Sequence, residues 1–122
     1  MTRVILRPAT RVDFEAMLAE PLPYRVRAFA AERDGELLGI GGIAFQPGGT
    51  VAAFAQMKPG ANRYKIALHK AGLRTIAEIK RLGIRRVVAT AEKGNAAAEP
   101  WLERLGFRPM KTGDEIVWVW TL

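Results

Sequence analysis

Cysteine is absent from the 122-residue sequence, and histidine occurs once, as His69. A chain without cysteine can form neither a disulfide framework nor a thiolate metal site. A single histidine does not support a histidine-based metal centre, which combines several ligands. The longest apolar runs are far shorter than the roughly 18 residues that cross a bilayer as a helix. We therefore expect a protein that uses no metal and has no membrane partner.

The amino-terminal stretch MTRVILRPATR also lacks an uninterrupted apolar segment, because Arg3 and Arg7 lie inside it. A secretory signal peptide needs such a segment. Together with the absence of cysteine, this favours a soluble protein in a reducing compartment, and we expect a cytoplasmic location.

Hydrophobic residues make up 49% and charged residues 25% of the sequence, which is the balance of a globular protein. The length suits one domain with a modest core, so residues 1–122 are expected to form a single domain. The formal net charge of +7 favours an anionic partner, such as nucleic acid, a phosphorylated cofactor or an acidic protein surface. Lysine and arginine are spread along the chain, without the basic block of a nucleic-acid-binding tail.

Hydrophobic periodicity and turn residues predict the order β-α-β-β-β-α-β-α-β-β. Asp34-Gly35 is a hairpin signal, and Pro59-Gly60 breaks the chain before a long helix. The glycines at 39, 41 and 42 indicate a bulge. The expected strands are 3–7, 25–33, 36–46, 50–57, 85–91, 107–111 and 115–121, and the expected helices are 10–20, 62–82 and 95–105. This order implies an α/β (α+β) fold with a mixed, mainly antiparallel sheet of about six to seven strands and helices on both faces.

The long helix is predicted to be amphipathic. Its apolar face contains Leu68, Ala71, Gly72, Ile76, Ile79 and Leu82, and its opposite face contains Arg63, Lys70, Arg74 and Arg81. His69 lies near the apolar edge, where we expect a partly buried structural histidine. Trp118 and Trp120 share one face of the last strand, and we expect them to pack in the core or an interface. The alternative is that they line the substrate-binding site.

The stretch GNAAAEPWLERLGF predicts a helix that opens at Asn95 and ends at Leu105-Gly106-Phe107. This signature and the order of elements resemble the GNAT superfamily of acyl-CoA-dependent N-acetyltransferases over nearly the whole chain. The stretch RPAT before the first helix also resembles the family's opening, although a second amino-terminal helix is missing. The resemblance implies a fold in which the fourth strand and the strand after the long helix separate to hold acyl-CoA.

The same resemblance implies acetyl-CoA as the cosubstrate. The backbone of the fourth strand would bond the pantetheine arm, and the loop opening the long helix would hold the pyrophosphate. A helix N-terminus suits this role because it offers unpaired N–H groups and a positive dipole end. The expected cofactor-binding residues are Gln56, Met57, Asn62, Arg63, Tyr64, Lys65, Ile66, Ala67 and Asn95.

Two positions depart from the family's pattern. The family's phosphate loop reads Gln/Arg-x-x-Gly-x-Gly/Ala, and the matching stretch Asn62–Ala67 has Lys65 where glycine is expected. A lysine can contact phosphate directly, but its Cβ can also crowd the loop. Many family members protonate the leaving CoA thiolate with a tyrosine three residues before Leu-Gly-Phe. This chain has Leu102 there, and leucine cannot donate a proton.

The implied reaction also needs a base that takes a proton from the amine, and the fourth strand has no carboxylate. Glu92, at the end of the strand 85–91, is the expected catalytic base, and Glu32 is the alternative. For each of these residues, a purely structural role is the alternative. Glu92 could be a solvated loop residue, Asn95 could be only a helix N-cap, and Lys65 could be a solvated first-turn residue.

Three functions fit the sequence. The first is an N-acetyltransferase that transfers an acetyl group from acetyl-CoA to an amine, including a protein or peptide amine. The second is a GNAT-fold binding or structural protein that has lost catalysis, such as a virion-associated protein encoded by a phage or prophage; Lys65 and Leu102 favour it. The third is a basic nucleic-acid-binding domain, which only the charge supports. Homo-oligomerisation stays open, because a partner chain could complete the acceptor side.

Overall fold

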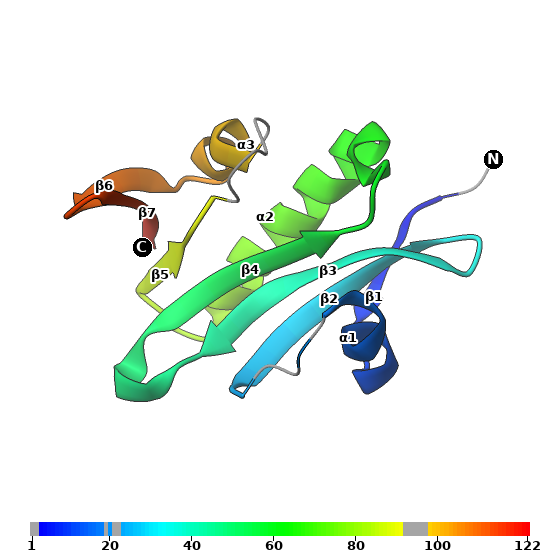
Figure 1. Ribbon diagram of the computed structural model, residues 1–122, viewed down its shortest axis with the longest axis horizontal. Coiled ribbons are helices and arrows are strands. Elements are labelled where there is room, and N and C mark those ends of the chain that lie inside the picture. Colours follow the sequence, from blue (N-terminus) through cyan, green and yellow to red (C-terminus); the bar gives the residue numbers. More distant parts are fainter. Residues whose placement is uncertain (1–2, 19, 21–22, 92–97) are drawn as a thin grey trace.

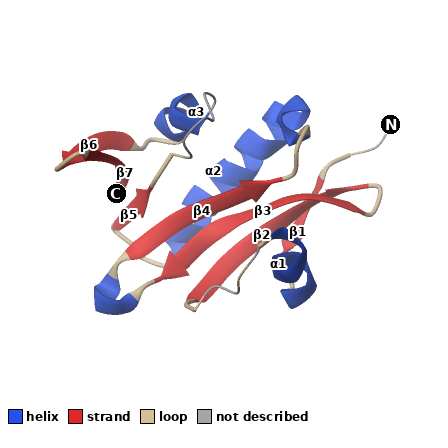
Figure 2. Cartoon of the chain, in the orientation of Figure 1, coloured by secondary structure: helices blue, strands red, loops and turns tan. Residues whose placement is uncertain are grey.

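The computed structural model describes residues 3–18, 20, 23–91 and 98–122 (Figures 1 and 2). Within these residues, seven strands form one sheet in the order β1-β2-β3-β4-β5-β7-β6. The strands are β1 Ile5–Pro8, β2 Arg25–Arg33, β3 Glu36–Phe45, β4 Val51–Met57, β5 Arg86–Ala89, β6 Arg108–Thr112 and β7 Glu115–Thr121. The helices are α1 Arg11–Met17, α2 Lys65–Arg81 and α3 Ala98–Arg104, with 3-10 helices at Pro47–Gly49 and Ala61–Tyr64. Among these helices, none is long and apolar enough to cross a membrane.

The expected order of elements and the mixed, mainly antiparallel sheet are confirmed. All neighbouring strands are antiparallel except β4 and β5, which are parallel and joined through α2. Asp34 and Gly35 have φ angles of 55° and 77°, as in a two-residue hairpin with both central residues left-handed. The register of β2 and β3 shifts so that Ala31 pairs with Gly39 but Glu32 pairs with Leu37. The glycine-rich strand therefore contains the predicted bulge.

Helices cover both faces of the sheet, as expected (Figure 1). α1 packs against one face, where the Phe14 ring centroid lies 6.5 Å from that of Phe54 in β4. α2 packs against the other face, where the Arg74 guanidinium lies 5.4 Å from the centroid of Phe29 in β2. The connection from β4 through α2 to β5 therefore crosses one face only, which is the geometry of a strand-helix-strand unit.

The main core lies between the sheet and the face that α2 and α3 cover. Its buried residues are Ile43, Ile76, Ile79, Val87, Ala89, Phe107, Trp118 and Trp120. The two tryptophans are each 5% exposed, so the prediction that they pack in the core is confirmed. α3 approaches α2 closely at Gly72, where an added Cβ would lie 2.9 Å from Leu105 and 3.2 Å from Trp101.

Two helices differ from their predicted bounds. α1 ends at Met17 and not near residue 20, because Leu18 already has extended backbone angles. The prolines at positions 21 and 23 disfavour helical conformations in the residues before them. The α-helix expected from residue 62 begins at Lys65, because Tyr64, the last residue of the 3-10 helix Ala61–Tyr64, has the non-α-helical angles φ −104° and ψ 42°.

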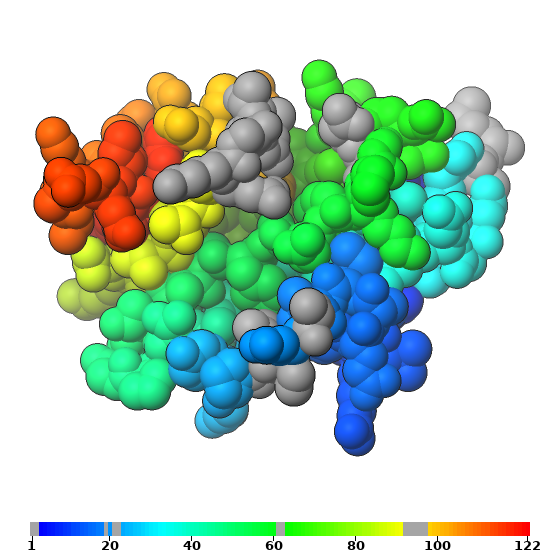
Figure 3. Space-filling view, in the orientation of Figure 1, coloured from blue at the N-terminus to red at the C-terminus, as the bar shows by residue number. Residues whose placement is uncertain are grey.

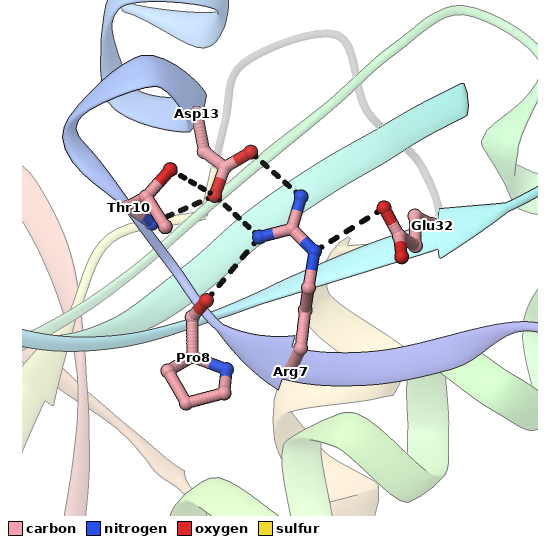
Figure 4. Close-up of polar contacts among 5 residues, drawn as sticks. All are labelled: Arg7, Pro8, Thr10, Asp13 and Glu32. Atoms are coloured by element: carbon pink, nitrogen blue, oxygen red, sulfur yellow. Dashed lines mark hydrogen bonds and ion pairs between the residues drawn. The ribbon is translucent and has the colours of Figure 1, made fainter. Parts of the chain in front are cut away.

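A charged cluster joins β1, α1 and β2 (Figure 4). Asp13 is 5% exposed, and its carboxylate accepts hydrogen bonds from Arg7 Nη1 at 2.6 Å and Nη2 at 2.9 Å. The same carboxylate accepts the Thr10 N–H at 2.7 Å at the start of α1, and Arg7 Nε lies 3.2 Å from Glu32. The Arg7 hydrogen bonds hold the pKa of Asp13 well below its ordinary value, against the effect of burial. The cluster therefore fixes both α1 and β2 to β1.

Candidate functional site

β4 and β5 separate towards their carboxyl ends (Figure 1). Their parallel pairing consists of one registered pair, Ala52 with Val88, although β4 continues to Met57. On its other side, β4 is paired with β3 over its whole length. Within the described residues, the main-chain groups of β4 that face β5 beyond Ala52 therefore have no strand partner. We call this region the β4–β5 splay.

The chain leads from the splay into α2 through residues 58–67, which we call the α2 entry loop. Part of this loop lies at the surface, in green in Figure 3. The Lys58 N–H donates to the Leu38 carbonyl at 2.9 Å, which extends the pairing of β3 and β4. Gly60 follows with a φ of 85°, a left-handed conformation that favours glycine. The 3-10 helix Ala61–Tyr64 then precedes α2.

The α2 entry loop is basic and leads to a helix N-terminus that can attract anions. Arg63 and Lys65 are exposed. The first turn of α2 contains no acidic residue, and no side-chain hydrogen bond caps it in the described structure. Because a helix N-terminus carries a partial positive charge and unpaired N–H groups, this end of α2 can bind a phosphate group.

The predicted cofactor-binding residues gather at the end of the splay and in the α2 entry loop. Gln56, Arg63, Lys65 and Ile66 are exposed, and Met57, Tyr64 and Ala67 are half-buried. Asn62 lies in the 3-10 helix before α2. Glu92 and Asn95 lie outside the described residues, so their predicted roles stay predictions.

One contact of the α2 entry loop was not predicted from the sequence. Arg33, the last residue of β2, donates from Nη1 to the Tyr64 hydroxyl at 2.8 Å. Its guanidinium carbon lies 5.3 Å from the centroid of the Tyr64 ring, within the range of a cation–π contact. The two residues are 31 positions apart, and no local pattern marks either of them. Only the fold reveals the contact.

α3 directs Leu102 towards the core. Leu102 is half-buried and packs against the main core cluster. His69 is also half-buried, as expected, and its Nδ1 and the Nε1 of Trp101 are buried without a hydrogen-bond partner in the described part of the chain. In the described part of α3, Leu102 is thus a packing residue.

Glu32, the alternative base, is held by the charged cluster and lies away from the splay. Its Oε2 is 3.2 Å from Arg7 Nε, and its strand, β2, is separated from β4 by β3. Residues 3–18, 20, 23–91 and 98–122 contain no group of three or more His, Asp or Glu that could hold a metal ion.

A cavity of about 200 Å³ lies at the other end of β4. Its lining residues are Gly48, Gly49, Thr50, Val51, Arg86 and Val88. They surround the amino-terminal ends of β4 and β5, whereas the α2 entry loop follows the carboxyl end of β4. The cavity is therefore separate from the predicted cofactor site.

The fold is similar to that of solved acetyltransferases. The ribosomal-protein-S18-alanine N-acetyltransferase of Escherichia coli has a TM-score of 0.73 at 17% identity, over 99% of this chain and 94% of that one. A GCN5-related N-acetyltransferase of Kribbella flavida has a TM-score of 0.75 at 18% identity, over 98% of both chains. A Bacillus subtilis acetyltransferase in complex with CoA has a TM-score of 0.68 at 15% identity, over 100% and 99%.

No protein-family model and no curated protein matches the sequence. The structural similarity nevertheless covers almost the whole chain. The protein therefore has the fold of the GNAT superfamily of N-acetyltransferases, and the fold that the resemblance implied is confirmed.

Proposed function

We propose that the protein binds acetyl-CoA across the β4–β5 splay and the α2 entry loop and transfers the acetyl group to an amine. This proposal rests on one observation, which is that two suitable features meet in one segment of the chain. Within the described residues, β4 has main-chain groups without a strand partner beyond Ala52. It leads directly into a basic helix N-terminus without an acidic first turn. The first feature suits the amides of pantetheine, and the second suits the pyrophosphate.

In the proposed reaction, the amine nitrogen attacks the thioester carbonyl, so that a C–N bond forms and the C–S bond breaks. The amine loses a proton, and Glu92 is the proposed acceptor of that proton. Asn95 is proposed to contact the pantetheine arm. Leu102 cannot protonate the departing thiolate, so the thiolate leaves unprotonated or takes a proton from water. General acid catalysis contributes about 10²–10⁴-fold, so its absence slows the step without preventing it.

For the acceptor, we propose a protein or peptide amine. The E. coli protein of similar fold acts on the alanine of ribosomal protein S18. A GNAT-fold binding protein without catalysis is the second candidate, because Leu102 packs against the core in place of a proton donor. The first candidate requires acyl-CoA binding and turnover, whereas the second, a binding or structural protein, requires no turnover.

Replacing Lys65 by alanine is expected to weaken CoA binding about tenfold or more. Lys65 is the first residue of α2 and is exposed, so its ammonium can reach a phosphate held at the helix N-terminus. A charge-assisted contact of this kind is worth roughly 1.5–3 kcal/mol, and about 1.4 kcal/mol corresponds to a factor of ten. Calorimetric titration with CoA at low salt measures the change, which should shrink as the salt concentration rises.

Lys80→Ala is the matched control, because Lys80 is exposed at the opposite end of the same helix and should leave the affinity unchanged. Lys65→Gly restores the family's glycine. It would improve binding if the approach of the backbone to phosphate limits affinity. Equal affinities for the wild type and both Lys65 variants would remove Lys65 from the site.

A further inference from the structure

The hairpin of β2 and β3 holds the α2 entry loop at two points. Near the start of the loop, the Lys58 N–H donates to the carbonyl of Leu38 in β3. At the junction with α2, the Tyr64 hydroxyl accepts the hydrogen bond from Arg33 Nη1 at 2.8 Å, and the Arg33 guanidinium lies 5.3 Å from the ring. In the described part of the chain, the residues between these points pair with no strand, and the two contacts join this part of the loop to the hairpin.

The second contact acts where the 3-10 helix meets α2. Tyr64 is the last residue of the 3-10 helix and occupies the N-cap position of α2, with φ −104° and ψ 42°. No side-chain hydrogen bond caps the helix in the described structure. The Tyr64 side chain is half-buried and makes a hydrogen bond to one rigid element, the end of β2. The contact therefore joins the start of α2 to the end of β2.

We propose that Arg33 is a positioning residue for pyrophosphate binding. It acts through Tyr64 by holding the α2 entry loop in the conformation that receives the diphosphate of CoA, and this inference rests on the proposed function. A preorganised loop binds more tightly because less conformational freedom is lost on binding. The competing explanation is that Arg33 acts through its positive charge alone. The two explanations differ in what they predict for Tyr64.

The test compares CoA affinity, measured by calorimetry, with melting temperature for Arg33→Ala, Arg33→Lys, Tyr64→Phe and the double variant Arg33→Ala/Tyr64→Phe. Arg33→Ala is expected to weaken CoA binding about fivefold to tenfold, and Tyr64→Phe about threefold or more. The double variant should bind CoA no more weakly than Arg33→Ala, because both changes break the same interaction between Arg33 and Tyr64. Arg33→Lys should recover only part of the affinity, since an ammonium lacks the planar guanidinium. Arg25→Ala, at the exposed other end of β2, is the control.

Three results would overturn the proposal. The first is a full recovery by Arg33→Lys with no effect of Tyr64→Phe, which would show that charge alone acts. The second is additive losses in the double variant. The third is a lower melting temperature with unchanged CoA affinity, which would make the contact only structural.

The failure of the proposed function gives a different result. Wild-type protein that binds no CoA would overturn that function and the binding role of Arg33 with it. Amide hydrogen exchange would still test the loop itself. Faster exchange at Tyr64 and Lys65 in Arg33→Ala than in the wild type would confirm that Arg33 holds the loop, and equal exchange would reject it.

Discussion

Gly42→Ala is expected to lower the free energy of unfolding by more than about 3 kcal/mol, a large part of the roughly 5–15 kcal/mol that stabilises an ordinary folded protein. A Cβ at Gly42 would overlap the carbonyl oxygen of Arg27 and would lie 2.6 Å from the Cα of Ala28. Both obstacles are backbone atoms of β2, so they cannot move without breaking the pairing of β2 and β3. Since β3 also pairs with β4, the damage would reach the wall of the splay. Circular dichroism during heating and urea unfolding measures the loss.

Gly41→Ala is the matched control for this prediction. A Cβ at the neighbouring Gly41 would lie 3.3 Å from the Phe54 oxygen and 3.6 Å from the Ala55 Cβ. Those contacts need only small shifts, so we expect a loss below about 1 kcal/mol. Similar stabilities of Gly41→Ala and Gly42→Ala would contradict the close approach of β2 and β3.

Asp13→Ala is expected to cost about 2–3 kcal/mol of stability at neutral pH. The substitution removes two hydrogen bonds from Arg7 and the one from the Thr10 N–H. Breaking a fully buried ion pair costs about 3–5 kcal/mol, but the Arg7 side chain is 31% exposed and keeps Glu32, which moderates the loss. Glu15→Ala, in an exposed pair with Arg11 on the same helix, should change the stability by less than about 0.5 kcal/mol.

The same cluster predicts how stability depends on pH. Arg7 holds the pKa of Asp13 below its ordinary value in the folded protein, so the ionised carboxylate stabilises the fold above a pH of about 4. This contribution to stability is lost as the pH falls below that value, because the Asp13 carboxylate becomes protonated. Urea unfolding at pH 7, 5 and 3 should show that the free energy of unfolding decreases less towards acidic pH in Asp13→Asn than in the wild type. Parallel losses would contradict the role of Asp13.

Much of the fold could be predicted because its signals are local. The Asp34-Gly35 turn, the glycines of the bulged strand β3 and the apolar face of α2 each act over a few residues. The order of elements then limited the number of sheet topologies that the chain could form. The end of α1 and the 3-10 turn before α2 were missed, because helix ends depend on backbone angles that weak propensities do not determine.

The candidate site was predicted through the resemblance, and its tertiary contacts were not. The sequence predicted that Asp13 lies near the start of a helix. Its burial beside Arg7 of β1 depends on the fold. The pairing of Arg33 with Tyr64 likewise depends on the fold, which brings the end of β2 to the start of α2. Such contacts join ordinary charged and aromatic residues that have no motif around them.

The central claim is that acetyl-CoA binds at the β4–β5 splay and the α2 entry loop. Titration of isotope-labelled protein with acetyl-CoA, followed by backbone amide NMR, tests both binding and location. The account predicts saturable shifts concentrated in the carboxyl half of β4 and in residues 58–67. The absence of saturable shifts at millimolar acetyl-CoA would contradict it. So would shifts concentrated around Arg86 and the cavity at the amino-terminal ends of β4 and β5.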